Sequence, residues 1–157
     1  MRDLSEINMN QGGKPVTRRS PLEAEIQAFE KEFNVSLPAD YVAFLNYSNG
    51  GHPELDSVLP EARSDLPPRG LDHFYYLDND WLGSSSLWSG AAAWRELLGQ
   101  RYVAFAEDAG GNPFLFDLSQ TPLAIITCLH DEGLTLLKMA SSFGAFIDAL
   151  EADPDMI

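Results

Sequence analysis

Residues 37–51 read LPADYVAFLNYSNGG and predict one short helix with both of its ends marked in the sequence. Pro38 suits the first helical position, where its missing N–H and fixed φ cost nothing. The residues after the helix, Asn49-Gly50-Gly51, tolerate the positive φ that a helix C-cap and the following turn require. Four residues lie on one side and form a mostly apolar stripe: Tyr41, Phe44, Leu45 and Ser48. No side chain here is chemically reactive, so the stretch indicates a fold and favours binding over catalysis.

A second helix is expected before this one. Ser20, Pro21 and Glu23 have the pattern of a capping box, with a hydroxyl at the N-cap, proline at the first helical position and a carboxylate at the third. Apolar residues then recur at helical spacing, which predicts a helix over 20–33: Leu22, Ile26, Phe29 and Phe33. The connection to the helix at 38–48 is short, so the two helices are expected to form a helical hairpin.

The remainder of the chain predicts a sheet and a closing helix. We expect a short edge strand within 52–60, the least ordered segment over 61–70 and an aromatic strand over 71–77. A helix capped by Ser89 should end at Gly99. The later elements are strands at 102–107, 114–118, 123–129 and 134–138, and a helix at 142–150. The expected fold class is α+β, with one mainly antiparallel domain over 20–157 and a flexible N-terminal arm over 1–19.

Composition fits a single globular domain. The chain has 157 residues, of which 45% are hydrophobic and 11% aromatic, enough to build one core. No apolar run approaches the roughly 18–20 residues that cross a membrane, and the polar N-terminus shows no secretory signal. Cys128 is the only cysteine and lies in an apolar run, so we expect a buried strand residue. These features together predict a cytoplasmic protein.

The net charge restricts the possible partners. Twenty-four acidic residues face ten basic ones, for a net charge of −14. From Ser20 onward there are six basic and 22 acidic residues, so the expected domain carries −16. Nucleic acid and anionic membranes need basic footprints, and the charge therefore disfavours both. It favours a basic protein partner, although solubility alone also explains an acidic chain.

The sequence contains no catalytic, cofactor or metal motif. The three histidines, His52, His73 and His130, lack metal-ligand spacing. His130 lies beside two acids and could join remote partners in a metal or general-base site, but we favour a solvated turn. The chain also has no Gly-x-Ser-x-Gly elbow and no P-loop, and Gly110-Gly111 is typical of a hairpin turn. We therefore expect no catalytic residue, no cofactor and no metal.

One alternative of a different class stays open. Glu107 and Asp108 precede the expected hairpin turn, and Asp117 follows on the returning strand. If these carboxylates converged, with His130 nearby, they could bind a cation or perform the acid–base chemistry of a hydrolase.

Three parts of the chain together resemble the SUKH superfamily, which includes the yeast Smi/Knr-type cell-wall-assembly regulator domain and many bacterial immunity proteins. They are the helix at 37–51 with the helix before it, the strand pair around Gly110-Gly111-Asn112-Pro113, and the closing helix from Ser141 to Leu150. The resemblance covers about residues 20–151. It implies a single α+β domain with a twisted, mainly antiparallel sheet, no shared catalytic residues, and direct binding of a toxin, often a nuclease, from a polymorphic or contact-dependent system.

The expected function is therefore a non-catalytic, cytoplasmic binding protein, monomeric or weakly dimeric, that neutralises a basic toxin by covering its active surface. Seven acids and aromatics are the candidates for contacting the partner: Asp56, Asp78, Asp80, Trp81, Trp88, Glu107 and Asp108. The yeast resemblance leaves one alternative, a regulatory or scaffold module without a toxin partner.

Overall fold

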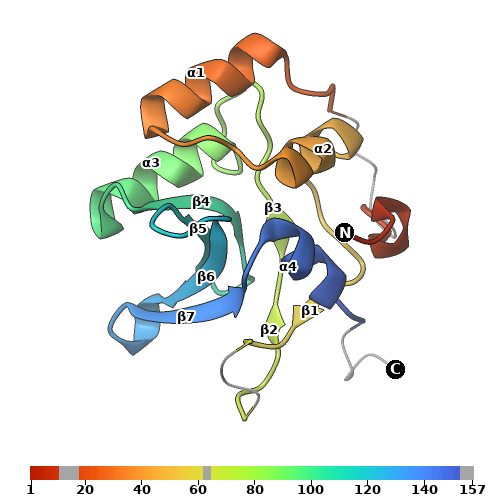
Figure 1. The fold of residues 1–157 in the computed structure, drawn as a ribbon, viewed down its shortest axis with the longest axis vertical. Helices are drawn as coiled ribbons and strands as arrows, with labels where there is room; N and C mark the ends of the chain where they lie inside the picture. The colour runs from red at the N-terminus through yellow and green to blue at the C-terminus, as the bar shows by residue number, and fades with distance from the viewer. Residues whose placement is uncertain (11–17, 62–64, 153–157) are drawn as a thin grey trace.

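The computed structural model describes residues 1–10, 18–61 and 65–152. The helices are α1 (Glu23–Phe33), α2 (Ala39–Tyr47), α3 (Leu87–Leu98) and α4 (Phe143–Ala149), with two short 3-10 helices, η1 (Leu4–Ile7) and η2 (His130–Glu132). The strands are β1 (Ser57–Val58), β2 (Arg69–Gly70), β3 (His73–Phe74), β4 (Tyr102–Glu107), β5 (Pro113–Asp117), β6 (Ala124–Leu129) and β7 (Thr135–Ala140). This order confirms the α+β class (Figure 1).

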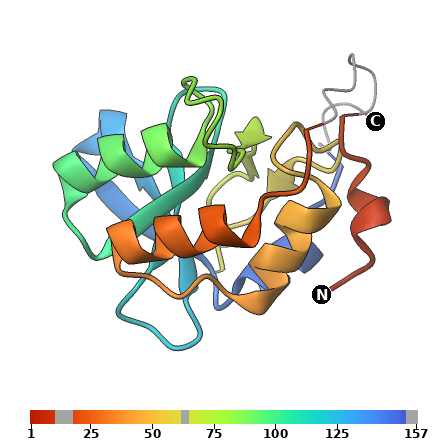
Figure 2. The same ribbon diagram turned by 90° about the horizontal axis from the view of Figure 1, so that it is seen from above.

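Five strands form one antiparallel sheet in the order β3-β4-β5-β6-β7, so that each pairs with the next along the chain. Strands β1 and β2 form a separate two-stranded ribbon. Helix α3 packs along β4, α4 packs against β6 and β7, and α2 packs on α4 (Figures 1 and 2). Successive strand residues point to opposite faces, and every residue of β5 and β6 is buried. Both faces of the sheet are therefore covered.

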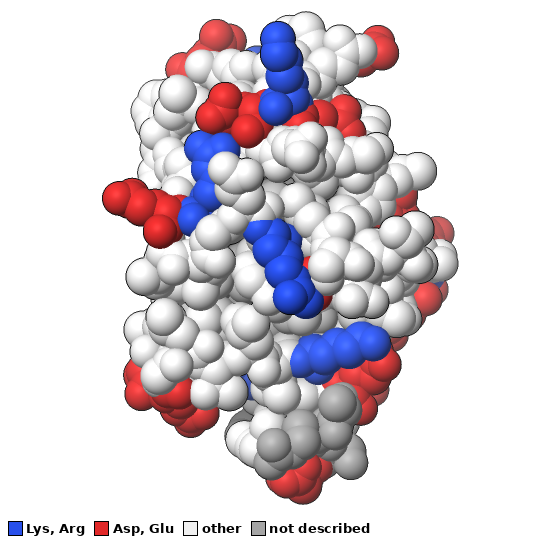
Figure 3. Space-filling view, turned by 60° about the vertical axis from the view of Figure 1, so that its left-hand side comes forward, with Lys and Arg blue, Asp and Glu red and all other residues white. Residues whose placement is uncertain are grey.

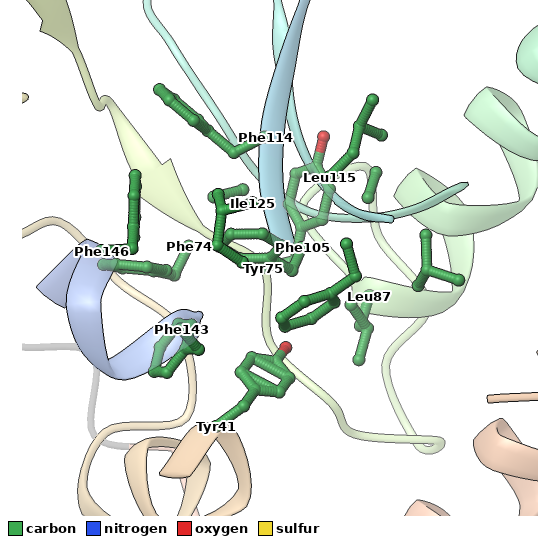
Figure 4. Packing of buried hydrophobic residues seen from close by; sticks show 14 of the residues in the cluster. Tyr41, Phe74, Tyr75, Leu87, Phe105, Phe114, Leu115, Ile125, Phe143 and Phe146 are labelled. Carbon is green, nitrogen blue, oxygen red and sulfur yellow. The ribbon is translucent and has the colours of Figure 1, made fainter. Parts of the chain in front are cut away.

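An aromatic cluster joins α2, the sheet and α4 at the centre of the domain (Figure 4). The ring centroid of Tyr41 lies 5.0 Å from that of Phe116 and 5.1 Å from that of Phe143. Phe105 stacks on Phe116 at 4.4 Å, and Phe44 lies 5.6 Å from Phe143. Edge-to-face and offset pairs of this kind add roughly 0.5–1.5 kcal/mol each to the burial of the rings.

The helix predicted from residues 37–51 is present. Its residues Tyr41, Phe44 and Leu45 are buried, as the apolar stripe predicted. The helix begins one residue later than expected, because Pro38 is its N-cap and accepts the first hydrogen bond from Val42. Gly50 and Gly51 have φ of +81° and +111°, which confirms the turn that the glycine pair predicted.

The starts of α1 and α3 correct two capping predictions. Helix α1 begins at Glu23, and the Ser20 hydroxyl donates to the Asn46 carbonyl (3.0 Å) instead of capping the helix. The exposed N–H of Leu22 is satisfied by the Glu25 carboxylate at 2.9 Å. Helix α3 is capped by Ser86, three residues before Ser89, and the Ser86 hydroxyl accepts from the Ser89 N–H at 3.0 Å. Both helices therefore begin at a residue other than the predicted one, and another side chain satisfies a free N–H at the observed start.

The aromatic segment 71–77 is buried but is a strand only at β3. The Tyr75 N–H still donates to the Phe105 carbonyl (2.9 Å), after which Tyr76 leaves β4 and forms a parallel bridge with Ser86. The expected edge strand within 52–60 is β1. Its partner β2 lies in the segment expected to be least ordered, of which residues 62–64 are outside the described part of the chain.

Residues 1–10 of the expected arm pack on the domain. The Ile7 side chain is fully buried, and Met9 forms a bridge with Pro53. The Arg2 guanidinium donates to the Leu150 carbonyl after α4 at 2.7 Å. Residues 11–17 of the expected arm lie outside the described residues, and Arg19 at its end bonds to Glu25 of α1.

Two further expectations concern the core and membranes. Cys128 is buried in β6 as predicted, and burial raises the pKa of its thiol, which disfavours the reactive thiolate. Within the described residues, none of the helices has the length and apolar character needed to cross a bilayer.

The Tyr41 hydroxyl generates a stability prediction. It is buried without a hydrogen-bond partner among the described residues, and burial raises the pKa of Tyr41. An unsatisfied buried hydroxyl costs about 1–3 kcal/mol. Tyr41→Phe keeps the ring contacts and should raise the free energy of unfolding in urea by about 1 kcal/mol.

Tyr75→Phe is the matched control, because the Tyr75 hydroxyl donates to Glu107 at 3.2 Å and its loss should destabilise the protein. If Tyr41→Phe lost stability as Tyr75→Phe does, the Tyr41 hydroxyl would have a partner and the assignment would be wrong.

Candidate functional site

Four of the seven candidate residues gather around one loop. Residues 78–83 connect the aromatic segment to α3, and we call them the Trp81 loop. The candidates at this loop are Asp78, Asp80, Trp81 and Trp88. The structure thus places residues from a loop and from the first turn of α3 at one site next to the start of α1.

The Glu25 carboxylate holds the loop against α1. Its side chain is only 7% exposed, and Arg19 donates to it through Nη1 at 2.5 Å and Nη2 at 3.1 Å. It also accepts from the backbone N–H groups of Leu22 (2.9 Å) and Asn79 (2.6 Å). The Arg19 hydrogen bonds, with the two backbone donors, outweigh burial and lower the pKa of Glu25 to about 2. One carboxylate therefore ties the loop to the N-terminus of the helix.

Arg19 extends this network to the loop acids. Its Nη2 donates to Asp78 at 2.9 Å and lies 3.5 Å from a carboxylate oxygen of Asp80. The Asp78 carboxylate also accepts from the backbone N–H of Asp80 at 2.9 Å, which forms a local turn within the loop. Asp78 is thus largely neutralised, whereas the Asp80 side chain is 90% exposed.

Asn49, from the stretch that identified α2, fixes the other side of the loop. Its amide oxygen accepts from the Leu77 N–H at 2.7 Å, and its amide nitrogen donates to the Leu77 carbonyl at 2.9 Å. The same nitrogen donates to the Arg19 carbonyl at 2.9 Å. Asn49, which the sequence predicted only as a turn residue, therefore positions the two backbone segments that lead into the site, at Leu77 and at Arg19.

Trp88 supports the loop from below. Its ring contacts Phe29 and Phe33 of α1 with centroid distances of 5.4 and 5.7 Å. Its indole N–H donates to the Asn79 side chain at 2.7 Å. Trp88 is half-buried and acts as a brace, in contrast to the exposed anchor that the sequence suggested.

The tip of the loop is apolar and exposed. Trp81 is 63% and Leu82 60% exposed, and Leu22, joined to the loop through Glu25, is 58% exposed. We call these three residues the apolar patch. Gly83 allows the chain to turn beneath them, because a Cβ there would lie 2.9 Å from the Tyr76 hydroxyl and 3.0 Å from the Trp81 indole nitrogen. Neither leucine is among the residues predicted from the sequence to contact a partner, since exposure cannot be read from residue type.

The other three candidates lie elsewhere. Asp56 is half-buried before β1 and its carbonyl accepts from Leu71 at 2.6 Å. The expectation that Asp108 is an exposed acid is wrong: it is 8% exposed, pairs with Arg69 at 3.0 Å and accepts from the Asn112 N–H at 2.8 Å. A short turn presents several N–H groups to one carboxylate, so Asp108 shapes the β4–β5 turn.

Glu107 joins a second polar cluster. Its carboxylate lies 3.2 Å from His73 Nε2 and accepts from the Tyr75 hydroxyl at 3.2 Å. Asp72 and His52 lie on the other side of His73. No sequence pattern indicated this cluster, because its two histidines are 21 positions apart and only the fold brings them together.

The hydrolase alternative required Glu107, Asp108 and Asp117 to converge, and the strand register places them apart. Glu107 is opposite Pro113 and Asp117 is opposite Tyr102, at the other end of the hairpin. Arg101 donates to both Asp117 oxygens at 2.9 and 3.0 Å, which lowers the pKa of Asp117 to about 2 despite burial. The carboxylates therefore do not converge as this alternative required.

The negative charge is partly paired at the surface. Figure 3 shows a face on which Lys and Arg side chains lie in a row, with Asp and Glu side chains beside them. Pairs across the chain include Arg95 with Glu32 at 3.1 Å and Lys138 with Glu61 at 3.6 Å. The excess of acids is thus spread over the domain, and the basic side chains are largely engaged by acids rather than forming a nucleic-acid footprint.

The chain matches a known protein family. The family model described as SMI1 / KNR4 family (SUKH-1) matches residues 21–149, from just before α1 to the end of α4. A comparison with curated proteins finds no match. The matched range includes the Trp81 loop and most of the Glu25 network, but Arg19 lies just outside it.

The Glu25 network generates a pH prediction. Glu25→Gln keeps the shape of the side chain but removes the charge that accepts hydrogen bonds, and should lower the free energy of unfolding at pH 7 by roughly 1–3 kcal/mol. The folded-state pKa of about 2 lies below the ordinary 4.5. The stabilisation is therefore complete above about pH 5 and lost as the pH falls towards 2.

Urea unfolding from pH 7 to pH 2.5 measures the effect, and the curves of the two proteins should converge at the acidic end. Glu23→Gln, exposed on the same helical turn, should behave like the wild type. A gap between Glu25→Gln and wild type that stayed constant with pH would contradict the role of the charge.

Proposed function

Because the chain belongs to the SMI1 / KNR4 family (SUKH-1), we propose that it is a non-catalytic protein-binding domain, acting in the cytoplasm as an immunity protein that neutralises a cognate bacterial toxin by direct binding. The observation that carries the proposal is the apolar patch: an exposed tryptophan and two exposed leucines around a loop that hydrogen bonds hold at its start and at Gly83, its last residue.

Trp81 has the properties of a binding anchor. Most large apolar side chains of the described residues are buried, yet this indole is 63% exposed beside a leucine that is 60% exposed. Protein interfaces draw most of their binding energy from a few residues, and tryptophan is the most enriched among them. Covering this ring and the two exposed leucines would remove apolar area from water.

The support beneath the patch lowers the cost of binding. Glu25 and Asn49 fix the backbone at the start of the loop, the Tyr76 hydroxyl accepts from the Gly83 N–H at its end, and the Trp88 indole holds the Asn79 side chain. A loop that is already ordered loses little conformational entropy when a partner covers it, so more of the contact energy appears as affinity.

The charges around the patch fit a basic partner. Asp80, next to Trp81, has a side chain that is 90% exposed, and the chain as a whole carries −14. Exposed charges at the rim of an interface mainly raise the association rate, whereas buried anchors set the dissociation rate. A basic toxin domain would be attracted by the acidic surface and retained by the apolar patch.

The test uses the purified full chain and the toxin domain encoded beside its gene. Trp81→Ala should weaken binding at least 30-fold, about 2 kcal/mol, mainly through faster dissociation, and should abolish protection when the two proteins are expressed together. Asp80→Asn should slow association and reduce its dependence on salt, with little change in dissociation.

Leu97→Ala is the matched control, because Leu97 is 56% exposed at the opposite end of α3, and its affinity should stay within threefold of the wild type. Binding that Trp81→Ala leaves intact would move the interface elsewhere. If the chain neither binds nor neutralises the neighbouring toxin and instead captures a housekeeping enzyme, the immunity role fails and the regulatory or scaffold role replaces it.

A further inference from the structure

Two histidines and an aspartate meet on the side of the domain formed by the Gly50-Gly51 turn and β3. His52 and His73 line a cavity of about 360 Å³, and Asp72 lies between them. One nitrogen of each ring and one carboxylate oxygen lie within 4.8 Å of one another. This cluster shares no residue with the Trp81 loop.

Backbone pairing holds the two histidines at this distance. Gly51 and Phe74 exchange two hydrogen bonds, of 3.1 and 2.9 Å, which join the turn before His52 to the strand that carries His73. The Asn10 side chain accepts from the His52 N–H at 2.9 Å, and its carboxamide lies so close to Gly51 that a Cβ there would clash at 2.5 Å. The fold therefore positions both imidazoles before any ligand arrives.

The donor distances are close to those of a four-coordinate metal site. With metal–nitrogen and metal–oxygen bonds near 2.0–2.1 Å, neighbouring donors in a tetrahedral Zn²⁺ site lie about 3.3 Å apart. Asp72 Oδ2 is 2.7 Å from His73 Nδ1 and 4.0 Å from His52 Nδ1. Shifts of less than about 1 Å would place all three around one ion. The His52 side chain is 67% exposed and can make this adjustment by rotating away from the Asp72 carbonyl.

Each ring nitrogen of His73 faces a carboxylate. Its Nδ1 faces Asp72 at 2.7 Å, and its Nε2 faces Glu107 at 3.2 Å. A neutral imidazole has a single N–H, so one ring nitrogen presents a lone pair to a carboxylate. The Nε2 atom is buried without an aligned hydrogen-bond partner among the described residues. A cation at Nδ1 would remove the conflict, because Nε2–H could then donate to Glu107.

Glu107 has the role of an outer-sphere carboxylate in this arrangement. A histidine that ligates a metal through one nitrogen usually donates its other N–H to a carboxylate, which fixes the tautomer and makes the ring a better ligand. The Tyr75 hydroxyl in turn donates to Glu107 at 3.2 Å and orients it. Arg18 is the cationic side chain that lines the same cavity, and its guanidinium is stacked 3.6 Å above the Tyr76 ring.

We propose that His52, Asp72 and His73 bind one divalent transition-metal ion, for which Zn²⁺ is the best fit, and that Glu107 supports His73 from behind. Two imidazoles and one carboxylate match the ligand preference of Zn²⁺ better than that of Ca²⁺ or Mg²⁺, which favour sites built from oxygens. The fourth position is left to water or to a side chain of a bound protein. The site goes beyond the proposed binding function and does not depend on it.

The test is a Zn²⁺ titration of tag-free full-length protein, treated with EDTA and dialysed, by calorimetry at pH 7.5. We expect one ion per chain with a dissociation constant in the micromolar range or below. His52→Gln and His73→Gln should each weaken binding at least tenfold, and Glu107→Gln should weaken it about 10–100-fold while the stoichiometry stays at one. Co²⁺ in place of Zn²⁺ should give the visible absorption of a four-coordinate nitrogen and oxygen site.

His130→Gln is the control, since His130 is exposed at the start of η2 and bonds to Asn112, outside the cluster. Absence of binding would overturn the proposal. So would binding of several ions per chain that His52→Gln leaves unchanged, because exposed carboxylates would then be the ligands. His52 is the decisive position, since its exposed side chain can be replaced without disturbing the core.

Discussion

The burial of aromatic rings between α2, the sheet and α4 is the constraint on which the rest of the structure depends. Tyr41 contacts Phe116 and Phe143 at centroid distances near 5 Å, so a single helical residue touches both a central strand and the closing helix. Fixing α2 in this way also fixes the residues that leave it. Asn49 follows directly, and its side chain clamps Leu77 and Arg19, on which the Trp81 loop depends. A chain of direct contacts therefore links the aromatic core to the candidate binding surface.

Charge has two separate roles in this protein. Where acids are buried they accept several hydrogen bonds and organise the chain, as Glu25 does for the Trp81 loop and Asp108 does for the β4–β5 turn. Where they are exposed, as at Asp80, they contribute to a field that attracts a basic partner. The net charge of −14 does not reveal this division, because it counts buried and exposed acids equally. Only exposure and hydrogen bonding separate the acids that build the domain from those that can meet a partner.

Several predictions failed where two local signals competed. Ser20 and Ser89 both have the residue type and spacing of helix caps, yet neither caps its helix. The Glu25 carboxylate accepts from the Leu22 N–H at the start of α1, and the Ser86 hydroxyl accepts from the Ser89 N–H at the start of α3. The choice depends on contacts made elsewhere, such as the bond of Ser20 to Asn46. The convergence of Glu107 with Asp117 failed for a related reason: spacing on two strands says nothing about register, and the register places them at opposite ends of the hairpin.

The sequence by itself determined the α+β order, a helix near 38–48 with its glycine turn, and the buried cysteine, because these follow from apolar periodicity and from proline and glycine at the helix ends. Its motifs also resembled the family that the comparison shows. It also suggested Trp81 and the acids near it as contact residues. Tertiary structure alone decided that Trp81 is exposed while Trp88 is a brace, that Leu22 joins the patch, and that His52 meets His73. These outcomes depend on contacts between segments distant in the chain, and a local pattern carries no information about which distant surface will cover a side chain or leave it in water.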